Sequence, residues 1–128
     1  MWNKQKEPPP FRYLAHTEVL AGVLTTTANE DPHILQGPLL LLTHLSLHAM
    51  EYGGVVMAAS LTLDTLEVSE DPTDLSLTLF SESQHEGSLR GRGEGKGLQL
   101  YVRLGERGWA MWVPIMRRAV AEKHRTSS

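Results

Sequence analysis

The sequence contains no cysteine, which excludes disulfide bonds, thiolate-bound zinc and a catalytic thiol. Its most apolar run, PLLLLTHLSLHAM, is too short to span a bilayer and is interrupted by two histidines. The first residues, MWNKQKEPPPFRY, lack the apolar core of a signal peptide. Together these absences predict a soluble protein, cytoplasmic or otherwise intracellular, with no membrane partner.

Basic side chains are also missing from most of the chain. No Lys or Arg occurs from Tyr13 to His85. The first 85 residues carry three basic and eleven acidic side chains, whereas residues 86–128 carry nine basic and four acidic ones. This division predicts acidic and basic surfaces that complement one another between molecules. In the alternative interpretation the division reflects only the scarcity of lysine in strands, and it does not extend to the folded surface.

The length of 128 residues predicts one domain. Residues 1–12 hold three consecutive prolines and predict a flexible arm, so that 13–128 form a single globular domain. From Leu39 to Leu104 apolar side chains recur at every second position, which is typical of strands. Residues 14–27 are ambiguous, because their apolar spacing fits a helix while their threonines and valines favour a strand.

After this region the pattern changes. The segment GERG, residues 105–108, predicts a tight hairpin turn, and WAMWV, residues 109–113, a short return strand. Pro114 suits the first position of a helix, and the apolar stripe that follows predicts an amphipathic one. The expected fold is therefore α+β, a mainly antiparallel meander of five to seven strands with one C-terminal amphipathic helix.

Two histidines raise the question of a metal site. In a helix His44 and His48 would lie about 6 Å apart with Glu51 one turn further on. In a strand the same histidines lie about 13 Å apart, too far to share one zinc ion. The alternation favours the strand, so no metal and no cofactor are expected. A metal-dependent enzyme that uses these three residues stays as the second alternative.

The segment RGRGEGKG, within the loop 88–97, combines glycines with Arg90, Arg92 and Lys96. Glycine lets backbone N–H groups approach a phosphate, but a strand follows where a phosphate cradle would need a helix. Tyr101 and the two late tryptophans lie close by in sequence. A basic loop beside aromatic side chains predicts, as the first alternative function, a single-stranded nucleic-acid-binding protein.

No catalytic constellation is visible in the sequence. The favoured interpretation is a non-catalytic protein–protein interaction module or structural subunit, which binds copies of itself or another protein. Acidic turns containing Glu70, Asp71 and Asp74 are its expected counterparts in a partner molecule. The expected contact residues are Arg90, Arg92, Lys96, Arg103, Arg107, Trp109, Trp112, Arg117 and Arg118.

Overall fold

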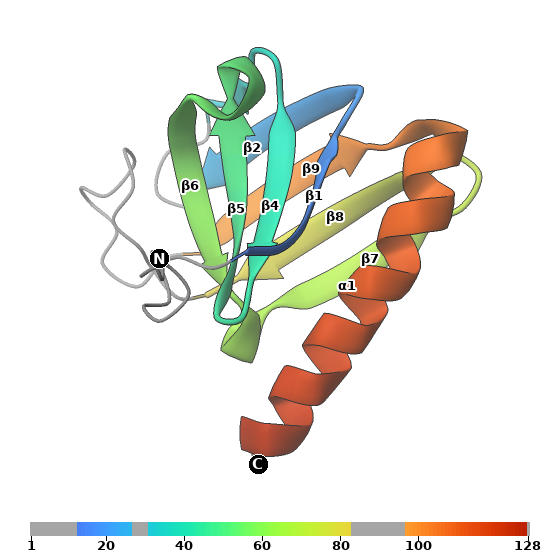
Figure 1. Cartoon of the computed structure of the whole chain (residues 1–128). Coiled ribbons are helices and arrows are strands. Elements are labelled where there is room, and N and C mark those ends of the chain that lie inside the picture. Colours follow the sequence, from blue (N-terminus) through green and yellow to red (C-terminus); the bar gives the residue numbers. More distant parts are fainter. Residues whose placement is uncertain (1–12, 27–30, 83–96, 128) are drawn as a thin grey trace, which may run out of the picture.

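The computed structural model describes residues 13–26, 31–82 and 97–127. It contains two antiparallel sheets packed against each other and a single C-terminal helix, as Figure 1 shows. The predicted fold class is therefore confirmed, with nine strand segments in the described ranges. The proline-rich arm, residues 1–12, and the basic loop residues Arg90, Arg92 and Lys96 lie outside these ranges.

Each sheet is built around a meander of three strands. The first sheet has four strands in the order β1 (Tyr13–Glu18), β4 (Leu39–Thr43), β5 (Ser46–Glu51) and β6 (Val56–Thr62). The second has five, in the order β3 (His33–Ile34), β2 (Ala21–Thr26), β9 (Leu98–Arg103), β8 (Ser76–Ser81) and β7 (Glu67–Asp71).

The two sheets are joined at the corner between β1 and β2. Val19 donates its backbone N–H to the carbonyl of Pro38, directly before β4, at 3.2 Å. The next residue, Leu20, donates to the carbonyl of Arg103 at the end of β9, at 2.8 Å. Consecutive residues thus bond to different sheets, and the ambiguous segment 14–26 is an extended chain that crosses from one sheet to the other.

The core lies between the inner faces of the sheets. The alternation along β5, β8 and β9 places every second side chain inside, as the period of two predicts, although Ser76 and Leu77 at the start of β8 are both buried. Leu75 departs from this pattern, because it lies in the β7–β8 turn with a φ of 55° and is half-buried. Two short 3₁₀ segments, η2 (Tyr52–Gly54) and η3 (Leu63–Thr65), flank β6. The leucines that are fully buried in the core are Leu24, Leu40, Leu42, Leu47, Leu61, Leu63, Leu66, Leu77, Leu79 and Leu100.

The C-terminal helix begins earlier than the sequence predicts. It spans α1 (Gly105–Ser127), so the predicted hairpin turn 105–108 and return strand 109–113 are wrong, and Pro114 lies inside the helix. Its inward side chains, Trp109, Trp112, Val113 and Met116, recur at the helical spacing of three and four residues and pack on the core. The helix contacts β1 of the first sheet and η3, which leads into β7 of the second. It therefore covers one opening between the sheets.

Candidate protein-interaction surfaces

Part of the charge division of the sequence is neutralised inside the molecule. Three described ion pairs join a basic side chain of the C-terminal part to a carboxylate of the acidic part. They are Arg103–Asp74 at 3.8 Å, Arg117–Glu70, and Lys123–Asp64 at 3.9 Å. Glu70 and Asp74, which the sequence placed in a partner molecule, thus have partners within their own chain.

Of these pairs, the one between α1 and β7 has the best geometry. Arg117 Nε donates to Glu70 Oε2 at 2.7 Å and Arg117 Nη2 to Glu70 Oε1 at 2.5 Å. Such a two-point contact is the strongest form of an Arg–carboxylate pair. The hydrogen bond from Arg117 lowers the pKa of the Glu70 carboxyl. The contact fixes the helix beside the edge of the second sheet.

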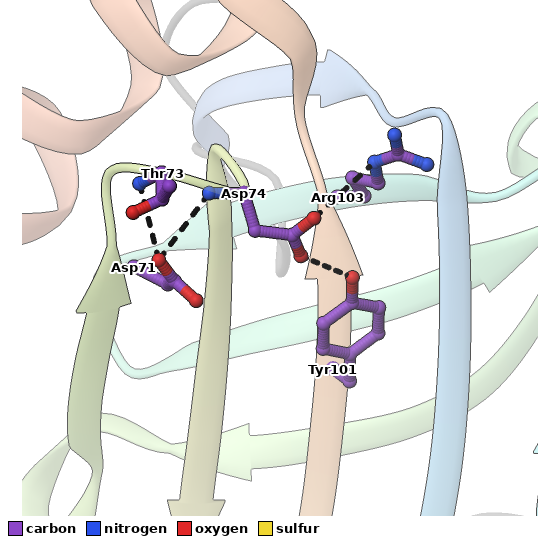
Figure 2. A network of polar contacts seen from close by, with 5 residues as sticks. All are labelled: Asp71, Thr73, Asp74, Tyr101 and Arg103. Atoms are coloured by element: carbon purple, nitrogen blue, oxygen red, sulfur yellow. Dashed lines mark hydrogen bonds and ion pairs between the residues drawn. The ribbon is translucent and has the colours of Figure 1, made fainter.

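A polar network closes the β7–β8 turn against β9 (Figure 2). The Tyr101 hydroxyl donates to Asp74 Oδ2 at 2.6 Å, and Arg103 Nε approaches Asp74 Oδ1. The same phenol lowers the pKa of Asp74, and the carboxylate raises the pKa of Tyr101 in return. Asp71 Oδ1 accepts the backbone N–H groups of Thr73 and Asp74, which shapes the turn. The network is thus a structural tie between three strands.

The aromatic residues are placed differently from the expectation for a nucleic-acid binder. Trp112 is buried and Trp109 is half-buried, and both pack on the core from the inner side of α1. Their rings are therefore not available for stacking on bases. Tyr101 does lie on the outward side of β9 beside Arg103, but its hydroxyl already donates a hydrogen bond to the Asp74 carboxylate. The described residues thus give the nucleic-acid alternative little support.

The three residues of the metal alternative are separated. His44 is exposed in the turn between β4 and β5, whereas His48 lies on β5 and its Nδ1 is 2.6 Å from Ser60 Oγ. Glu51 points to the opposite side of β5 and is buried. Its carboxylate lies 2.9 Å from His33 Nε2 and accepts the Gln36 backbone N–H, and these contacts lower its pKa. Within the described ranges no group of three potential ligands surrounds a common point.

An exposed apolar area lies where β5 turns into β6, at the top of Figure 1. Tyr52, Val55, Val56 and Met57 expose 58%, 79%, 43% and 39% of their surfaces. Across the first sheet, Met57 on β6 pairs with Met50 on β5, and Met50 pairs with Leu39 on β4. Met50 and Leu39 are half-buried. We call these six residues the hairpin patch. The sequence analysis missed it, although the run of five apolar residues after Gly54 is a visible signal.

The remaining predicted contact residues lie on the outer side of α1. Arg107 and Arg118 are exposed, and they flank Met111 and Ile115, which expose 57% and 38% of their surfaces. Neither arginine has an ion-pair partner among the residues that the structure describes. Charged groups available for a partner molecule are thus found on the helix. No helix in the described ranges is long and apolar enough to cross a membrane.

Comparison with known proteins gives a likeness of fold only. No family model matches the sequence, and no curated protein sequence is similar to it. A structure of PDZ-RhoGEF DH/PH domains in complex with GTPγS-activated RhoA matches 88% of this chain at 14% identity and a TM-score of 0.54. A structure of Vav1, described as inhibited by an allosteric inhibitor that blocks GEF activity, matches 86% at 14% identity and a TM-score of 0.51. This chain covers only 30% and 27% of those chains.

Proposed function

We propose that this chain is a non-catalytic protein-interaction module, an adaptor or structural subunit that docks a partner protein through the hairpin patch. The observation that carries the proposal is the exposure of Val55, Val56 and Met57 on a described, folded hairpin. Large apolar side chains exposed together at one end of a hairpin are typical of an interaction site in soluble proteins. The fold shared with parts of GEF proteins agrees with a role in protein assemblies.

The chemistry of the patch defines the partner surface that fits it. The six residues carry no charge, and two acidic side chains are in register with them: Glu18, the partner of Leu39 on β1, and the buried Glu51, the partner of Val56. An apolar, uncharged partner surface would bury them without stripping water from a charge. The two methionines add flexible side chains that can adapt to such a surface.

A photo-crosslinking amino acid at position 57 tests the proposal, with the same group at the exposed Leu45, in the turn at the other end of β5, as the control. We expect one discrete crosslinked partner from position 57 alone, which disappears when Val55→Asp and Val56→Asp are added. Identical adducts from both positions, or adducts that survive the two aspartates, would refute docking at the patch.

A further inference from the structure

The outer side of α1 carries a row of two arginines and two apolar residues, which we call the basic stripe. Arg107, Met111, Ile115 and Arg118 follow one another at intervals of four, four and three residues. This spacing places them on one side of a helix, and the two arginines stand about 16 Å apart along its axis. The two residues in the middle of the stripe are apolar, and the two at its ends are cationic.

An acidic counterpart lies on β7, the edge strand of the second sheet. Glu67, Ser69 and Asp71 are exposed on its outward side, while Val68 and Glu70 are half-buried on the other. The two outer carboxylates stand about 13 Å apart along the strand. We call these three residues, with Phe80, the acidic strand face, because Phe80 is the register partner of Glu67 on β8 and is half-buried on the same side.

Both surfaces keep their charge after the internal pairs have formed. Arg103, Arg117 and Lys123 contact Asp74, Glu70 and Asp64. In the described residues no basic side chain pairs with Glu67 or Asp71. The structure thus divides the charges into an internally neutralised set and an outward set of opposite signs.

The two surfaces cannot meet within one molecule. Arg117 holds the helix at Glu70, which lies on the inner side of β7, while Glu67 and Asp71 project from the outer side. The stripe itself faces away from the core, because Trp112 and Met116 occupy the opposite side of the helix. A contact between stripe and strand face therefore requires a second copy of the chain.

We infer that the basic stripe of one copy binds the acidic strand face of another, with Met111 and Ile115 against Phe80. The spacings of about 16 and 13 Å are close enough for long arginine side chains to bridge. This inference goes beyond the proposed function, because it uses surfaces other than the hairpin patch and names a second copy of the chain as the partner. Because each copy carries both surfaces at different places, assembly is head-to-tail and continues until a ring closes or a filament forms.

Light scattering coupled to size-exclusion chromatography tests the inference on the full chain. At about 0.05 M salt we expect masses of two copies or more, which return to one copy in about 1 M salt, where charges more than about 3 Å apart are screened. Arg107→Glu/Arg118→Glu, the stripe variant, should be monomeric at both. Glu67→Gln/Asp71→Asn, the strand variant, should be monomeric too, and asparagine keeps the turn acceptor at position 71. Arg125→Glu is the control for one charge reversal on the same helix and should still assemble.

Mixing the two variants gives the decisive result. The stripe variant retains its strand face and the strand variant retains its stripe, so an equal mixture should form a dimer that cannot grow. A monomeric wild type at low salt, assembly of the stripe variant alone, or a mixture that stays monomeric would each overturn the inference. Val55→Asp/Met57→Asp should leave this assembly intact. The two experiments are therefore independent: self-association can be refuted while docking at the hairpin patch is supported, and docking can be refuted while self-association is supported.

Discussion

At the scale of single residues, the two most informative side chains are buried and polar. Glu51 is a buried carboxylate, and it accepts hydrogen bonds from the Gln36 backbone N–H and from His33, each at 2.9 Å. These contacts tie the segment around β3 to the end of β5. A buried acceptor with such partners is costly to alter, because its partners then lose their hydrogen bonds.

We expect Glu51→Gln to lower the free energy of unfolding by about 1–3 kcal/mol, since the amide cannot replace a charge-assisted contact to His33. Glu18→Gln is the matched control, because Glu18 is exposed on β1, and it should change stability by no more than about 0.5 kcal/mol. Urea titrations followed by circular dichroism measure both. Equal effects of the two substitutions would contradict the structural role given to Glu51.

Trp112 presents the opposite situation. It exposes 1% of its surface, and its Nε1 has no hydrogen-bond acceptor within the described part of the chain. Trp112→Phe removes both apolar volume and the unpaired N–H, so we expect a loss of no more than about 1.5 kcal/mol. Trp112→Ala should cost about 3–5 kcal/mol, because it leaves a cavity. Chemical denaturation followed by far-ultraviolet circular dichroism separates the two, and similar losses would show that the N–H is satisfied.

At the scale of elements, the strands were predictable and the start of the helix was not. Apolar and polar side chains alternate along β5, β8 and β9 because each strand has one inner face, and that period is visible in the sequence. Before Pro114, two glycines and bulky Trp and Val favour turn and strand locally. Packing on the core overrides this preference, and the helical spacing of Trp109, Trp112, Val113 and Met116 carries the signal across the proline.

The placement of the basic side chains was predictable only in part. Arg107 and Arg118 were named from charge alone, and the helix places both on its outer side. Arg117 is one residue from Arg118, yet it points to Glu70. Which of two neighbouring arginines is used internally depends on the helix phase and on the position of β7, and neither follows from composition. The bend between Val19 and Leu20, which splits the strands into two sheets, is likewise a tertiary property.

Two glycines on connecting elements give a matched test of backbone strain. Gly37 and Gly53 have φ values of +59° and +68°, in the left-handed region where a side chain costs about 1–2 kcal/mol. A Cβ on Gly37 would also lie 3.2 Å from the backbone of Tyr52, whereas a Cβ on Gly53 meets nothing within 4 Å. We therefore expect Gly37→Ala to lower the melting temperature more than Gly53→Ala does. Equal losses would mean that the contact between the Gly37 segment and η2 is easily relaxed.

At the scale of the whole molecule, folding brings the acidic and basic parts of the sequence together. The pairs to Asp74, Glu70 and Asp64 span β9 and α1 on one side and residues 64–74 on the other. Part of the charge asymmetry of the sequence therefore serves to form ion pairs within the folded chain. Among the described residues, the basic stripe and the acidic strand face carry charges that these internal pairs do not use.

This internal pairing predicts how stability depends on acid. Contacts in the folded chain lower the pKa values of Glu51, Glu70 and Asp74 below their ordinary range. Each then contributes stability that is fully present above the unfolded pKa of about 3.9–4.3 and is lost as pH falls through the folded pKa. Below about pH 5 the unfolded chain binds more protons than the folded one, so the free energy of unfolding should decrease steadily as the pH falls.

The triple variant Glu51→Gln/Glu70→Gln/Asp74→Asn should be less stable than the wild type at neutral pH, and its free energy of unfolding should decline less steeply with acid. A second triple variant, at Glu18, Glu67 and Glu106, controls for the loss of three negative charges. If the free energy of unfolding of both triple variants falls with acid as steeply as that of the wild type, the contacts of Glu51, Glu70 and Asp74 do not lower their pKa values in the folded chain.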